Sequence, residues 1–139
     1  MDITEFIGQI IKTIIICKED NDRGDTIEFR LANGKNYRMM HEQNCCESVI
    51  IEDICGNLDD LMNEPVVQAF EKTNSENPKK GDDENWTWTF YTISTLKGTI
   101  TIRWYGTSNG YYSERVSINE INNNEHTKIY KIWPYTIPI

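Results

Sequence analysis

The chain of 139 residues is long enough for one compact domain and too short for two, so we expect a single domain over residues 1–139. Hydrophobic residues make up 38% and charged residues 26%, a composition that argues against a disordered, collagen-like or membrane protein. The net charge of −8 repels phosphate and therefore disfavours direct binding of nucleic acid.

The N-terminal part predicts a short helix followed by a β-meander. Asp2 can cap a helix over residues 3–9, and Gly8 weakens that helix soon after it begins. A β-branched run and two alternating segments then predict three antiparallel strands. These strands cover residues 12–18, 26–31 and 35–40, with turns at residues 21–25 and 33–34.

The middle of the chain predicts two strands, a second short helix and a long loop. Val and Ile are frequent in residues 48–54, which we expect to form a strand. Asn57 offers an N-cap for a helix over residues 57–63, and a further strand is expected over residues 66–70. Residues 72–85 contain no large apolar side chain, so we expect a long flexible loop inside the domain.

The clearest β signal is the alternation of aromatic and polar residues in the last third. Trp86, Trp88 and Phe90 share one face of a strand, and we expect them to anchor the core. The second meander and an edge strand would then cover residues 86–91, 99–104, 111–118 and 128–134. The expected fold class is α+β, mostly antiparallel sheet in two meanders, with two short helices.

The whole negative excess lies in one segment. No Lys or Arg occurs between Arg38 and Lys72, whereas the segment holds eight acids: Glu42, Glu47, Glu52, Asp53, Asp59, Asp60, Glu64 and Glu71. If these carboxylates gather on one surface, their fields add within a Debye length of about 8 Å and favour a basic partner. We expect an acidic docking surface that includes Asp59, Asp60 and Glu64. The alternative is a solvated face that only keeps the protein soluble.

His41, Cys45 and Cys46 are candidates for metal or thiol chemistry. Imidazole and thiolate are natural zinc ligands, and His41 and Cys45 have the spacing of one helical face. The segment can therefore be interpreted as a zinc site, or as a thiol nucleophile with its base. The other interpretation is that a cysteine packs as a small hydrophobe while His41 hydrogen-bonds nearby acids. We assign no catalytic residue and expect no cofactor other than this zinc.

A second cluster surrounds the glycine-bracketed loop at residues 106–110. Its guanidinium and aromatic faces suit a nucleotide-sized ligand, and the glycines let the backbone approach a ligand closely. The alternative is a hairpin loop in which Asn109 and Gly110 supply positive φ and tyrosines cover the sheet edge. The candidate binding residues are Arg103, Tyr105, Asn109, Tyr111, Tyr112 and Glu114.

Two blocks of sequence carry a family resemblance. They are His41-Glu42-Gln43-Asn44-Cys45-Cys46-Glu47 and Arg103-Trp104-Tyr105-Gly106-Thr107-Ser108-Asn109-Gly110-Tyr111-Tyr112. With these blocks, residues 35–118 resemble a family of short phage and prophage proteins that is a domain of unknown function. The resemblance implies a mobile-element origin and the cytoplasm of a bacterial host, with no activity attached. Because small proteins of that origin often bind a host protein or a signalling molecule, the resemblance favours interaction over metabolism.

From these observations we expect a small acidic binding protein that inhibits a host defence protein by protein–protein interaction. Its partner would present a basic surface, and neither nucleic acid nor a membrane would be bound directly. Two alternatives stay open. One is a small metal-dependent enzyme or zinc-site protein that uses His41, Cys45 and Cys46, and the other is a protein that captures a nucleotide signal.

Overall fold

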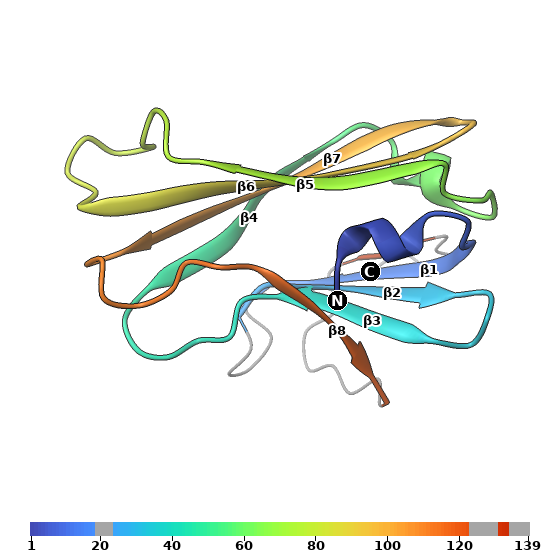
Figure 1. Cartoon of the computed structure of the whole chain (residues 1–139), viewed down its shortest axis with the longest axis horizontal. Helices are drawn as coiled ribbons and strands as arrows, with labels where there is room; N and C mark the ends of the chain where they lie inside the picture. The colour runs from blue at the N-terminus through green and yellow to red at the C-terminus, as the bar shows by residue number, and fades with distance from the viewer. Residues whose placement is uncertain (19–23, 123–130, 134–139) are drawn as a thin grey trace.

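The computed structural model describes residues 1–18, 24–122 and 131–133 and has two antiparallel β-sheets packed as a sandwich (Figure 1). The five-stranded sheet has the order β8 (Ser117–Ile121), β3 (Asn36–Met40), β2 (Thr26–Leu31), β1 (Ile11–Cys17) and β9 (Lys131–Trp133). The four-stranded sheet has the order β4 (Ser48–Cys55), β7 (Gly98–Ser108), β6 (Asn85–Thr95) and β5 (Gln68–Asn74).

The fold class is mainly β, so the predicted α+β class is wrong. No α-helix occurs in residues 1–18, 24–122 or 131–133, and the two predicted helices are single 3-10 turns, η1 (Ile3–Phe6) and η3 (Leu58–Leu61). Both turns stay short because the chain then becomes extended beside β1, where Ile10 bridges Pro65 and Ile11 bridges Met62. In this part of the chain no helix has the length and apolar character that a membrane crossing requires.

The predicted helix caps are confirmed even though the helices are not. The Asp2 side chain accepts a hydrogen bond from the Thr4 N–H and completes a capping box with Glu5. The Asn57 side chain accepts from the Asp59 N–H in the same manner. The capping residues therefore fix where each turn begins, while tertiary pairing decides where it ends.

The first predicted meander is confirmed. β1, β2 and β3 pair in chain order through antiparallel ladders. The predicted turn at Asn33 and Gly34 is present, with Gly34 at a φ of +89°. The turn predicted at residues 21–25 lies mostly outside the described residues.

The long loop is shorter than predicted because β5 extends to Asn74, where it pairs with Trp88 of β6. The polar residues at the end of β5 hide this pairing, since backbone groups rather than side chains form the ladder. The remaining loop, residues 75–84, folds over the outer face of the four-stranded sheet. There the Lys79 N–H donates to the Tyr105 hydroxyl over 3.0 Å.

The strand predicted over residues 111–118 has the wrong place and the wrong partner. β8 begins at Ser117 and pairs with β3, so the second meander consists of β5, β6 and β7. Residues 109–116, which we call the crossing segment, pass from one sheet to the other at one end of the sandwich (Figure 1). The predicted edge strand is present as β9 beside β1, and the rest of residues 128–134 lies outside the described residues.

The core lies between the two sheets, and the aromatic face of β6 is outside it. Tyr91 and Ile93 of β6 point inward and are 1% and 0% exposed. Trp104 of β7 is also fully buried in this core. The residues that were expected to anchor the core are only half-buried on the opposite face: Trp86, Trp88 and Phe90. That prediction is wrong because the period of two shows which side chains share a face, but not which face is covered.

Candidate functional site

The inner face of β6 changes from apolar to polar toward one end of the sandwich. Tyr91 and Ile93 belong to the core, but the next inward positions are Thr89, Thr87 and Asn85. A cavity of about 400 Å³ lies between these residues, with the neighbouring part of β5, and the crossing segment. We call it the Glu114 cavity; its other polar lining includes Glu71, Thr73, Tyr112, Glu114 and Arg115.

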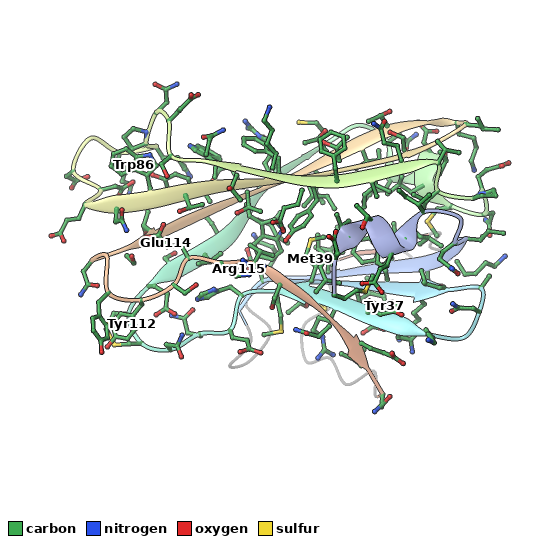
Figure 2. All side chains as sticks on the ribbon, in the orientation of Figure 1. Tyr37, Met39, Trp86, Tyr112, Glu114 and Arg115 are labelled. Atoms are coloured by element: carbon green, nitrogen blue, oxygen red, sulfur yellow. A yellow bond between two sulfur atoms is a disulfide. The ribbon has the colours of Figure 1, made fainter. Side chains whose placement is uncertain are left out.

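Glu114 is the most buried acid of this cavity, with 8% of the residue exposed. Its carboxylate oxygens accept hydrogen bonds from the Thr87 hydroxyl, over 2.7 Å, and from the Ser108 hydroxyl. The close approach depends on Gly106, where a Cβ atom would lie 2.9 Å from the Glu114 Cβ. Figure 2 shows Glu114 and Tyr112 together on the crossing segment, at the end of the sandwich where Trp86 also lies.

A second acid, Glu71 of β5, lines the same cavity beside Tyr91. Burial and a hydrogen bond with Glu71 raise the pKa of the Tyr91 hydroxyl above its ordinary value of 10. The same hydroxyl lies 3.3 Å from the Val116 carbonyl oxygen. Tyr91 therefore keeps its proton at neutral pH and joins the core to the polar end of the molecule.

A second cavity of about 290 Å³ adjoins the first and is more acidic. Tyr112 lines both cavities, and the neighbouring Tyr111 is 83% exposed. The centroids of the two tyrosine rings lie 5.0 Å apart, with the rings edge to face. Asn109 also lines the second cavity. We define the acidic end by the carboxylates that line either cavity and are not paired with His41: Glu71, Asp82, Asp83, Glu84 and Glu114.

His41 is buried and forms a side-chain contact with Glu47. Its Nε2 lies 2.8 Å from the Glu47 carboxylate and its Nδ1 lies 2.7 Å from the Arg115 carbonyl oxygen. Both ring nitrogens of His41 thus have an oxygen partner, and the ring is held from two sides. The pair fastens the end of β3 to the start of β4 and to the crossing segment.

Burial raises the pKa of Glu47, but hydrogen bonds more than offset it. His41 and the N–H groups of Asn44 and Cys45 donate to the carboxylate, and the pKa of Glu47 falls to about 2 from 4.5. Cys45 and Cys46 are joined as a disulfide at the exposed turn. Within residues 1–18, 24–122 and 131–133, no three His, Cys, Asp or Glu side chains are arranged to hold a metal ion.

Arg103 and Tyr105 do not meet Glu114, because they point to the outer face of the four-stranded sheet. The Arg103 guanidinium forms a bidentate pair with Asp53 and lies 5.5 Å from the Trp88 ring centroid. Burial and a hydrogen bond with Asp83 raise the pKa of the Tyr105 hydroxyl. The cluster predicted around residues 106–110 is therefore divided. Its Asn109, Tyr112 and Glu114 line the two cavities with Tyr111 beside them, whereas Tyr105 contacts the acidic end only through Asp83.

The acids of the charged segment do not gather on one surface. Glu47, Glu52 and Asp53 are paired with His41, Lys79 and Arg103. Asp59, Asp60 and Glu64 lie at η3, where the Thr95 hydroxyl donates to the Asp60 carbonyl oxygen at the far end of β7 from Ser108. Since Asp60 lies against Gly98 and Glu114 against Gly106, eight residues apart on β7, this group stands about 26 Å from Glu114, at the opposite end of the sandwich in Figure 1.

Several residues of the Glu114 cavity were missed by sequence reasoning. Thr87 and Thr89 carried a signal, because polar side chains at inward positions of a strand indicate a gap in the core. Ser108 belonged to the cluster predicted around residues 106–110 and Glu71 to the acids of the charged segment, but neither was expected at this cavity, since their part depends on where the crossing segment lies. Asp82, Asp83 and Glu84 were not considered, because the acidic surface was expected only between Arg38 and Lys72, where no Lys or Arg occurs.

Comparison of the chain with curated proteins gives no match, and comparison with solved structures gives none. A family model described as a domain of unknown function (DUF7448) matches residues 4–118. The matched region includes all residues that line the two cavities. It begins at residue 4, earlier than the resemblance to phage proteins, which covers residues 35–118. The chain therefore belongs to this family of domains of unknown function, DUF7448.

Proposed function

We propose that this protein is a binding protein whose acidic end recognises a basic surface of another protein. The observation that supports this function is the composition of the two adjoining cavities. Their combined lining holds six acids and one basic residue, Arg115. Acids so close together create a field that attracts a basic protein and repels phosphate, so a nucleic acid or a nucleotide is a poor partner.

The aromatic residues beside the cavities support a protein partner. Tyr111 is exposed at the tip of the crossing segment, and Tyr112 lies between the two cavities. Tyrosine is enriched among the residues that dominate binding energy at protein interfaces. A basic rim that surrounds a tyrosine-sized pocket on the partner would complement this end.

The resemblance to phage proteins leads to a narrower form of the proposal. The partner would be a protein of a bacterial host, bound in the host cytoplasm, and binding would inhibit it, with a defence protein as the leading candidate. What supports this is analogy with other small proteins of mobile elements, not chemistry. The acidic group at η3, Asp59, Asp60 and Glu64, is the rival docking surface.

Two variants with equal changes of charge distinguish the two surfaces. The first is Asp82→Lys with Glu84→Lys at the acidic end, and the second is Asp59→Lys with Glu64→Lys at η3. Immobilised wild type and both variants are used to capture proteins from bacterial lysate at low and high salt. We expect a basic protein that wild type and the η3 variant retain and that the acidic-end variant loses.

Equal loss in both variants would mean that only the total charge matters and would contradict a localised site. Loss in the η3 variant alone would move the docking surface to Asp59, Asp60 and Glu64. Capture that does not weaken at high salt would contradict the electrostatic basis of the proposal, because exposed charges are screened by salt.

A further inference from the structure

Glu114 differs from the other buried acids in the described part of the chain. Asp25 is paired with Lys18, Glu28 with Arg30 and Glu47 with His41. Glu114 accepts hydrogen bonds only from hydroxyl groups, those of Thr87 and Ser108, and no basic group of residues 1–18 or 24–122 lies within ion-pair distance of it. An ionised carboxylate in this position lacks the counter-charge that buried acids require.

The cavity beside Glu114 contains further unused acceptors. Thr89 is 3% exposed and lines the cavity, and its hydroxyl makes no hydrogen bond to another described residue. Each Glu114 oxygen accepts one hydrogen bond, although a carboxylate oxygen has room for a second. Arg115 also lines the cavity but is exposed and forms no ion pair with Glu114 or Glu71.

We propose that the Glu114 cavity binds the cationic side chain of a lysine or arginine that the partner protein inserts. Several N–H donors on one positive group match the acceptors of Glu114, Thr89 and Glu71 and supply the missing counter-charge. A cavity of about 400 Å³ has the volume of ordinary ligand sites, and Tyr112 offers an aromatic face at its border. This inference rests on the proposed function and names the part of the partner that is recognised.

Calorimetric titration at low salt tests the inference with three blocked amino acids. The probes are the Nα-acetyl, C-terminal methylamide derivatives of lysine, arginine and norleucine, the last of which lacks the charge. We expect the lysine or arginine probe to bind and the norleucine probe to give no heat. Glu114→Gln should weaken binding about 10- to 100-fold, because a charge-assisted hydrogen bond and the counter-charge are lost.

Matched variants separate the cavity from the general field of the acidic end. Glu42→Gln removes the same charge from an exposed side chain that lies near Ser113 and Arg115 but outside the acidic end, and it should change the affinity less than about threefold, as a surface ion pair is worth little. Thr89→Val removes the free acceptor without changing the charge and should weaken binding as well, which keeps the inference testable if Glu114→Gln does not fold.

Equal binding of the lysine and norleucine probes, or equal effects of Glu114→Gln and Glu42→Gln, would overturn the inference. Tighter binding of spermidine than of either blocked amino acid would make the occupant a free amine and would overturn it too. If Glu114→Gln still captures the partner from lysate while Asp82→Lys with Glu84→Lys does not, the cavity inference fails and the proposed function stands.

Discussion

Glu47 shows how a single carboxylate can hold three segments of this fold in place. It is fully buried at the side chain, accepts from the His41 ring, and also accepts from two backbone N–H groups of the turn that precedes β4. The Gln43 side chain donates to the Glu47 carbonyl oxygen over 2.5 Å. In this account the contact between His41 and Glu47 is structural, which agrees with the interpretation that His41 hydrogen-bonds nearby acids. The other part of that interpretation is wrong, because Cys45 and Cys46 are exposed and joined as a disulfide and do not pack as small hydrophobes.

Replacing Glu47 by Gln should lower the free energy of unfolding by about 3 kcal/mol at neutral pH, because the buried His41 ring and two backbone N–H groups lose the carboxylate that accepts their hydrogen bonds. Urea denaturation measures the change. The matched control is Glu42→Gln, an exposed acid five residues earlier in the chain, for which we expect less than about 0.5 kcal/mol. Equal effects of the two substitutions would contradict the structural role of the pair.

The acid dependence of stability follows from the same residue. The unfolded chain takes up the Glu47 proton near pH 4.5, whereas the folded protein takes it up only at about 2, so folding favours the ionised form. The stabilisation is complete above pH 4.5 and is lost as the pH falls through about 2, a contribution of about 3 kcal/mol. Between these two pH values the free energy of unfolding should fall less steeply with decreasing pH in Glu47→Gln than in the wild type. An unchanged slope would contradict the lowered pKa of Glu47.

At the scale of elements, the crossing segment creates the candidate site, and Gly106 lets it approach β7. A Cβ atom at Gly106 would lie 2.9 Å from the Glu114 Cβ and 3.2 Å from a Val49 methyl group. Gly106→Ala should lower the free energy of unfolding by about 1 to 3 kcal/mol through overpacking and should weaken binding of the lysine probe. Gly81→Ala is the control, since nothing lies within 4 Å of its Cβ position. A neutral effect of Gly106→Ala in thermal unfolding would count against the described packing.

The loop of residues 75–84 is a second element whose position depends on one side chain. The Tyr105 hydroxyl accepts from the Lys79 N–H and donates to Asp83 over 2.5 Å. Tyr105→Phe removes both contacts, so we expect faster tryptic cleavage after Lys79 and Lys80 and a loss of about 1 to 2 kcal/mol in stability. Tyr111→Phe, at an exposed ring, should change neither quantity. Unchanged cleavage in Tyr105→Phe would show that other contacts hold the loop.

Most strands could be predicted from the sequence, but their assembly could not. Alternation and turn residues located β1 to β4, β6 and β7, because these signals are local. The destination of β8 in the other sheet is a long-range choice that no local pattern records. For the same reason the inward direction of β6 was misjudged, since large aromatic residues fit a half-covered outer face as well as a core.

The candidate site could be predicted only in part, for a related reason. Asn109, Tyr111, Tyr112 and Glu114 were selected because glycines and aromatic residues flank one loop, and the structure places all four at the acidic end. The acids that complete this end come from β5 and from the loop before β6. Their contribution depends on the packing of two sheets and is invisible in the spacing of residues along the chain.

At the scale of the whole molecule, the sandwich keeps two acidic groups apart. The acidic end surrounds the crossing segment, and Asp59, Asp60 and Glu64 lie at the other end of β7, about 26 Å away. This distance exceeds the Debye length of about 8 Å at physiological salt, so the two groups act as independent surfaces. A partner that binds one end is therefore not attracted by the other.

The most direct test of this account is an NMR titration of the isotope-labelled protein with a short blocked oligolysine peptide. We predict that the shifted amide signals belong to residues 71–73, 82–89 and 108–116, and that residues 58–64 do not respond. Shifts confined to residues 58–64, or spread evenly over both ends, would contradict the assignment of the binding site to the acidic end.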